Sequence, residues 1–169
     1  CCQAVYAWIA CLQATAGTIS DRAFKHGEDD MTRNRVLFIC THNAARSQMA
    51  EGYLRARYGE RFEAFSAGTE VSAVSPYAIS VMREIGVDIS GHRSKLLKEF
   101  SGVEMDVAVV VCDAAKSACP CFPWAKETIH ATFRNPREFS GTDDQIRAGF
   151  REIRDEITVW IDHYVAGNA

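Results

Sequence analysis

Apolar residues gather in short runs from residue 36 onward, and these runs alternate with segments of helical periodicity. Runs at 36–40 and 107–112 predict buried strands, 62–65 predicts a strand closed by Ser66-Ala67-Gly68, and 129–133 predicts a weaker fourth. Strands that are apolar on both faces and alternate with helices are typical of a parallel sheet. We therefore expect an α/β fold with a four-stranded parallel sheet flanked by helices on both faces. We take the strand order to be 2-1-3-4, which makes the strands at 36–40 and 107–112 neighbours.

Three segments carry apolar residues at the spacing of one helix face. The first follows the strand at 36–40, and the second begins at Ser75-Pro76 and ends at Gly86. The third begins at Thr142, which forms a capping box with Gln145. The apolar positions are Met49, Ala50, Tyr53 and Leu54 in the first segment, Ile79, Met82 and Ile85 in the second, and Ile146, Phe150, Ile153, Ile157, Ile161 and Tyr164 in the third.

The composition suits one compact domain: of 169 residues, 47% are hydrophobic and 24% are charged. The net charge is −3, and acidic and basic residues are interspersed, so no basic face points to nucleic acid. No apolar run reaches the length that a transmembrane helix needs. The composition therefore predicts neither a nucleic acid nor a membrane as partner.

Residues 1–30 differ from the rest of the chain. The stretch "CCQAVYAWIACLQATAG" contains a short apolar run that ends on Ala14-Thr15-Ala16, as in an export signal, but it has no basic leading region. "MTRNRVLFIC" then begins at Met31 like an ordinary start before a first strand. We interpret 1–30 as an N-terminal extension, foreign or disordered, and 31–169 as the domain. A truncated export signal is the alternative.

The cysteines are too few and too irregularly spaced for a disulfide scaffold. Without a secretory context we expect reduced thiols in the cytoplasm, used for chemistry or buried in the core. The seven positions are Cys1, Cys2, Cys11, Cys40, Cys112, Cys119 and Cys121.

Cys40 ends the first predicted strand, and the first helix begins near Arg46. A loop that leads into a helix N-terminus directs backbone N–H groups and the positive helix end at a bound anion, and the same field favours a thiolate. Arg46 can hold two oxygens of a tetrahedral oxyanion, Ser47 can donate to the sulfur, and Asn43 tolerates left-handed backbone. The alternative for Cys40 is a small buried hydrophobe. The candidate oxyanion-binding loop comprises Thr41, His42, Asn43, Ala44, Ala45 and Arg46.

Cys-x5-Arg-Ser between a first strand and a first helix resembles the signature of the low-molecular-weight protein tyrosine phosphatase family. Within that fold the chain resembles the thioredoxin-coupled arsenate reductases, through "CTHNAARSQMAEG", "FSAGTE", "DISGHRSK", "VVVCDAAKSACP" and "FREIRDEI". The resemblance covers Met31 to about Val165. It implies reduction of arsenate to arsenite in arsenic detoxification, with thioredoxin as the external reductant. It also implies a monomer without a bound cofactor.

The resemblance implies a relay of three cysteines. Cys40 matches the nucleophile that attacks arsenate, Cys112 the thiol that attacks the resulting adduct, and Cys119 the thiol that takes over the disulfide. The small, polar residues 113–118 would cost little to rearrange locally. The alternatives are core filling, or a zinc clip through Cys119 and Cys121, for which His130 is a further ligand close by in the sequence.

Two positions depart from the family pattern. Asn135 precedes Pro136 where members usually carry an aspartate that serves as general acid, and an amide cannot replace that acid. Some members also bind a monovalent cation near the loop. Three residues match that site, Asn43, Glu51 and Ser66, but Lys95 replaces an acidic ligand. We therefore expect no bound metal, with a buried ammonium in the place of the cation; a solvated surface lysine is the alternative.

The alternative functions are a low-molecular-weight protein tyrosine phosphatase and a non-catalytic oxyanion-binding module. A phosphatase needs Cys40, Arg46 and an acid, but it has no use for Cys112 and Cys119. The sequence has the two additional thiols and lacks the acid. Both features favour the reductase.

Overall fold

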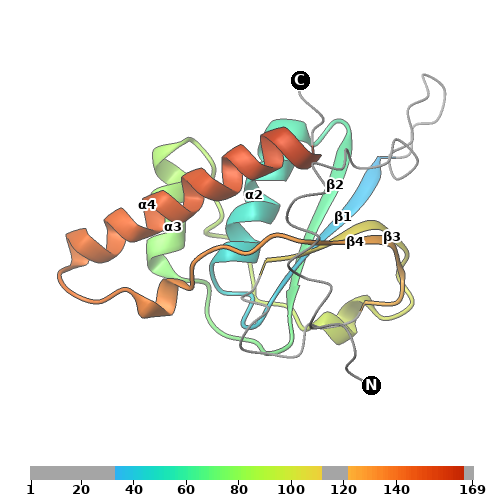
Figure 1. The fold of residues 1–169 in the computed structure, drawn as a ribbon, viewed down its shortest axis with the longest axis horizontal. Helices are drawn as coiled ribbons and strands as arrows, with labels where there is room; N and C mark the ends of the chain where they lie inside the picture. Colours follow the sequence, from blue (N-terminus) through green and yellow to red (C-terminus); the bar gives the residue numbers. More distant parts are fainter. Residues whose placement is uncertain (1–32, 112–121, 166–169) are drawn as a thin grey trace, which may run out of the picture.

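The computed structural model describes residues 33–111 and 122–165. Its four strands form one parallel sheet in the order β2-β1-β3-β4, which confirms the predicted topology (Figure 1). Residues 1–30, Cys112, Cys119 and Cys121 lie outside the described residues, and so do the predictions made for them. The strands are β1 (Asn34–Cys40), β2 (Phe62–Gly68), β3 (Met105–Val110) and β4 (Ala125–His130).

Three α-helices begin close to the predicted positions: α2 (Arg46–Tyr58), α3 (Pro76–Glu84) and α4 (Asp143–Trp160). Thr142 and Gln145 form the predicted capping box before α4, and Gly86 follows α3 with a φ of +77°. A π-helical turn, η3 (Ile161–Val165), continues α4, and two 3₁₀ turns are η1 (Leu97–Phe100) and η2 (Pro136–Glu138). Among the described residues, no helix is both long and apolar enough to cross a membrane.

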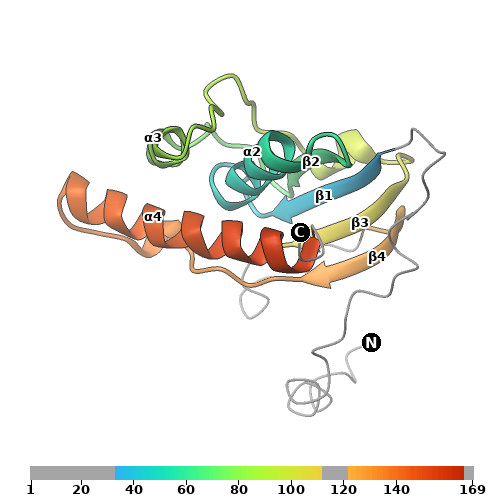
Figure 2. The same ribbon diagram turned by 90° about the horizontal axis from the view of Figure 1, so that it is seen from above.

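The sheet separates two apolar clusters. On one face, Val36 and Phe38 of β1 pack with residues of α2, α3 and α4, and α4 lies across the other two helices (Figures 1 and 2). On the opposite face, Leu37 and Ile39 pack with Phe122 and with residues of η1. Burial on both faces explains why the first strand reads as a continuous apolar run. In the described part of the chain, the element that covers this opposite face is the 3₁₀ turn η1, which the periodicity did not predict.

Two strand predictions need correction. The third strand was expected over 107–112 but spans Met105–Val110, although the Val111 N–H still donates to the Ile39 carbonyl at 2.8 Å. The fourth was expected over 129–133 but spans Ala125–His130. β4 is an edge strand in which half-buried and exposed residues alternate, and its exposed positions include Lys126 and Thr128. A search for apolar runs misses such a strand.

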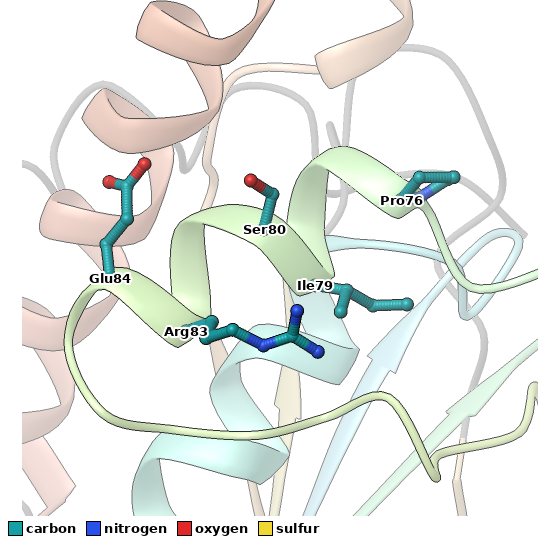
Figure 3. A pocket seen from close by; sticks show the side chains of 5 residues that line it. All are labelled: Pro76, Ile79, Ser80, Arg83 and Glu84. Atoms are coloured by element: carbon teal, nitrogen blue, oxygen red, sulfur yellow. The ribbon is translucent and has the colours of Figure 1, made fainter.

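Glu84 joins α3 to α4. Figure 3 shows its side chain directed away from Arg83, at one side of a hollow of about 300 Å³ on α3. Its carboxylate accepts from Arg151 Nη2 and Nε, at 2.7 and 2.8 Å, and from Arg154 Nη1 at 3.0 Å. Arg154 is only 8% exposed and also donates to the Val81 carbonyl. The hydrogen bond from Arg151, reinforced by Arg154, lowers the pKa of Glu84 to about 2.

Glu84→Gln should destabilise the domain at neutral pH and have less effect in acid. A carboxyl whose folded pKa is about 2 and whose ordinary value is 4.5 stabilises the fold above pH 4.5. That contribution is lost as pH falls from 4.5 towards 2. Because the side chain is 35% exposed, we expect at most about 1 kcal/mol. Urea unfolding of both proteins at about pH 7 and about pH 3.5 measures the difference, with the exposed Glu156→Gln as control. An equal difference at both pH values would contradict the prediction.

Candidate oxyanion site at the end of the first strand

The thiol of Cys40 lies at the carboxyl end of β1, beside Gly68 of β2 and immediately before the loop that leads into α2. Cys40 is 4% exposed. Its Sγ accepts the backbone N–H of Asn43 at 3.1 Å and lies 2.9 Å from Ser47 Oγ. The contact between Ser47 and the sulfur is the one expected from the sequence. Two donor groups therefore lie within hydrogen-bonding distance of this sulfur.

Asn43 determines the direction of these hydrogen bonds. Its φ of +46° is the left-handed backbone expected of it, and its side chain is fully buried. The side-chain nitrogen donates to Ser47 Oγ at 2.9 Å and to Ser66 Oγ at 2.8 Å. Because Ser47 Oγ accepts from Asn43, the Ser47 hydroxyl hydrogen is left to point at the Cys40 sulfur. Asn43 therefore supplies one donor to the sulfur directly and orients the other.

A buried carboxylate lies behind the loop. Glu51, whose side chain is 4% exposed, accepts from Ser66 Oγ and from the guanidinium of Arg55. Lys95 places its Nζ 3.0 Å from the same carboxylate, and its side chain is 14% exposed. The backbone N–H of Lys95 also donates to Asn43 Oδ1 at 2.7 Å. Lys95 is thus not a solvated surface lysine, and its ammonium is paired with the buried carboxylate of Glu51.

Gln48 also holds Asn43 in place, a role that sequence analysis did not predict. It is fully buried in the first turn of α2. Its side-chain nitrogen donates to the backbone and side-chain oxygens of Asn43, at 3.0 and 2.8 Å, and to the Arg93 carbonyl at 2.9 Å. His92 Nδ1 lies 2.9 Å from Gln48 Oε1, and burial lowers the pKa of His92 below its ordinary value. A neutral His92 with its hydrogen on Nδ1 donates to that oxygen and fixes the orientation of the amide.

Gly68 allows the loop to approach β2. A Cβ at this position would lie 2.6 Å from the Glu70 carbonyl oxygen, 2.7 Å from that of Thr41 and 2.8 Å from the backbone nitrogen of Asn43. All three are backbone atoms, which cannot turn aside as a flexible side chain could. The sequence showed this glycine only as the end of the second strand.

A pocket of about 220 Å³ opens above the thiol. Arg46 lies in its wall, 9% exposed, and donates to the Phe133 carbonyl at 3.0 Å. Asn135 also lines the pocket, and its side-chain oxygen accepts the N–H of Arg137. At about 30 Å³ for each water, the pocket holds several water-sized groups, enough for the four oxygens of a tetrahedral anion. Its lining comprises Cys40, His42, Ala44, Ala45, Arg46, Ser72, Ala73, Ser75, Asn135, Pro136, Arg137 and Phe150.

The structure therefore brings the predicted loop, Arg46, Ser47 and Asn135 to one place, with Glu51, Ser66 and Lys95 behind it. It does not place Cys112 or Cys119, which lie outside the described residues. Within residues 33–111 and 122–165, no three histidine, cysteine or carboxylate side chains form a group that could hold a metal ion. The arrangement is that of a buried thiol in the wall of a pocket that it shares with an arginine.

Known proteins share this fold and much of this sequence. The arsenate reductase of Halalkalibacterium halodurans is 39% identical over 127 residues, which are 75% of this chain and 91% of that protein. The solved structure of an arsenate reductase in the phosphate binding state has a TM-score of 0.64 and 29% identity, covering 80% of this chain and 99% of that one. For a thioredoxin-dependent arsenate reductase of Corynebacterium glutamicum, the TM-score is 0.57 and the identity 26%, covering 80% and 64%. Residues 35–165 match the family model for low molecular weight phosphotyrosine protein phosphatases, and the chain belongs to that family.

Proposed function

We propose that this protein is an arsenate reductase that uses Cys40 as its nucleophile and thioredoxin as its external reductant. It would act as a monomer in the cytoplasm without a bound prosthetic group. The observation that carries the proposal is the Cys40 sulfur, which has donors at 2.9 and 3.1 Å and lies in the wall of a pocket shared with Arg46. The names of the relatives support arsenate as the oxyanion.

In the proposed reaction the Cys40 thiolate attacks arsenate and displaces one oxygen, so that a sulfur–arsenic bond forms. Arg46 and the backbone N–H groups of Thr41, His42, Ala44 and Ala45 would hold the remaining oxygens. A second thiolate, Cys112, then attacks the Cys40 sulfur. The sulfur–arsenic bond breaks and its electron pair stays on arsenic. Arsenite then leaves, and a disulfide remains between Cys40 and Cys112. Cys119 would attack Cys112, release Cys40 and present a Cys112–Cys119 disulfide to thioredoxin.

Asn135 argues against a phosphatase as the main function. An ester leaving group needs a proton in the transition state, and general acid help is worth about 10²–10⁴ in rate. The structure places an amide in the pocket wall at this position, with its oxygen accepting from Arg137. An amide cannot supply that proton at neutral pH. A phosphatase also has no use for the additional thiols Cys112 and Cys119. Hydrolysis of aryl phosphates is therefore the lesser candidate function.

Oxidation of NADPH that requires arsenate, thioredoxin and thioredoxin reductase together tests the proposed function. Turnover of aryl phosphate without arsenate-dependent oxidation would instead indicate a phosphatase. Binding of phosphate with neither activity would indicate an oxyanion-binding module.

Two cysteine variants should stop the proposed relay at different points. Cys119→Ser should complete one round of reduction and stop with a Cys40–Cys112 disulfide, because no thiol remains to take over the bond. Cys112→Ser should release no arsenite and keep arsenic on Cys40. Mass spectrometry of single-turnover samples separates the two products. A Cys119–Cys121 disulfide in the oxidised wild type would contradict the relay.

A further inference from the structure

We propose that His42 is the catalytic acid of this site, a role that rests on the proposed function. It would donate the proton that the departing oxygen of arsenate needs. His42 replaces in this role the carboxylic acid that Asn135 cannot provide. The juxtaposition of His42, Cys40 and Arg46 in one pocket carries the inference.

The chemistry of the pocket wall leaves few candidates for this acid. Among its described lining residues, arginines, hydroxyls and the Asn135 amide do not release a proton near neutral pH, and Cys40 is the nucleophile. Histidine is the side chain that exchanges a proton in this range. Two carboxyl groups follow Asn135 closely in the sequence, those of Glu138 and Asp143. Neither residue lines the pocket, and the Asp143 carboxylate accepts a hydrogen bond from the Tyr77 hydroxyl.

The backbone around His42 is anchored on both sides, which keeps the imidazole at the pocket. Ser94 Oγ donates to the His42 carbonyl at 3.0 Å. The N–H of Glu70 donates to the Thr41 carbonyl at 2.8 Å, and this brings the Glu70 side chain to the same place. The His42 side chain is 26% exposed, so a proton lost to substrate can be replaced from solvent.

Glu70 orients the imidazole. Its Oε2 lies 3.2 Å from His42 Nε2, so the carboxylate accepts a hydrogen carried on Nε2 and holds the ring in place. Because Nε2 is engaged, Nδ1 is the atom that exchanges its proton with the pocket. The other ionisable groups that line the same pocket are the guanidiniums of Arg46 and Arg137 and the Cys40 thiol.

The proposed step balances without a further reactant. The Cys40 sulfur bonds to arsenic and one arsenic–oxygen bond breaks. The departing hydroxide takes the proton from His42 Nδ1 and leaves as water, so that the imidazolium becomes neutral imidazole. Arsenic stays pentavalent in this step, and its reduction begins only with the second thiol.

The experiment compares kcat/KM for arsenate in the wild type and in His42→Gln between about pH 6 and pH 9, with thioredoxin in excess. We expect a loss of about 10²-fold at pH 7, the lower range for general acids. The ratio of kcat/KM of the wild type to that of His42→Gln should fall as pH rises, because only the wild type has an acid at this position that loses its proton. Ionisation of arsenate affects both proteins equally and cancels in this ratio. His163→Gln, the same change at an exposed histidine outside the pocket, should leave the rate unchanged.

Two further variants separate proton transfer from charge and from structure. Glu70→Gln should lower kcat/KM for arsenate, but by less than His42→Gln does, because the imidazole remains and only its carboxylate partner is lost. His42→Lys keeps a positive charge but holds its proton more tightly, and full activity in this variant would overturn the proposal. So would a ratio that does not change with pH. Phosphate should still raise the melting temperature of His42→Gln; loss of that effect would assign His42 to the structure of the loop. A wild type that reduces no arsenate would refute the proposed function instead.

Discussion

Cys40→Ser should lower arsenate reduction by more than about 10³-fold, to the background rate, because removing a nucleophile costs an enzyme nearly all its chemistry. A hydroxyl in this position keeps its proton at neutral pH, even with two donors directed at it. The two donors beside this position are Asn43 N–H and Ser47 Oγ, and neither is a base that could remove the hydroxyl hydrogen. The coupled NADPH assay measures the loss.

The same variant should still bind oxyanions. Arg46 and the loop backbone do not depend on the sulfur, so phosphate should raise the melting temperature of Cys40→Ser about as much as that of the wild type. Cys121→Ser, the same change at a cysteine with no assigned role, serves as the control and should keep full activity. Arsenate turnover retained by Cys40→Ser would remove Cys40 from the role of nucleophile.

Gly68→Ala should damage the site although it adds only one methyl group. The new Cβ would lie within 2.8 Å of three backbone atoms, closer than real Cβ atoms approach, so the loop has to move. One of the three is the Asn43 nitrogen, whose N–H donates to the Cys40 sulfur. We expect a destabilisation of about 1–3 kcal/mol, as for other overpacked positions, and a loss of arsenate reduction of at least about tenfold. Urea unfolding and the coupled assay measure the two effects.

Gly91→Ala provides the matched control. A Cβ at Gly91 would meet nothing within 4 Å, and the residue is exposed close to His92. It should therefore change neither stability nor activity appreciably. If the two alanine variants behave alike, the close approach of the loop to β2 is not what requires Gly68.

The parts of this structure that depend on local pattern could be predicted from the sequence. Cys40 at the end of a strand, Arg46 at the start of a helix and the left-handed backbone of Asn43 each follow from neighbouring residues. The parallel sheet followed from the apolar runs and the intervening helices, whereas the order 2-1-3-4 was assumed and is confirmed by the structure. The edge strand β4 did not follow from these runs, because its exposed side chains are polar.

The supports of the loop could not be predicted in the same way. Gln48 looks like a surface residue of a first helical turn, yet it is buried because the segment that includes Arg93 folds against it. The contact between His42 and Glu70 likewise joins two segments that no periodicity relates. Lys95 was placed near the loop by family resemblance, and only the structure shows its ammonium 3.0 Å from Glu51.

The contacts that shape the loop join residues far apart in the sequence, so we expect the loop to form late in folding. Asn43 bonds to residues 23 and 52 positions away, Ser66 and Lys95, and Arg46 to Phe133, 87 positions away. Contacts of such separation form only once the sheet has assembled, so a short fragment carrying the motif would not bind an oxyanion. Any anion that binds the completed loop pulls the folding equilibrium towards the native chain, by about 2.7 kcal/mol at a hundred times its Kd. An oxyanion that binds this loop would thus also act as a ligand of folding.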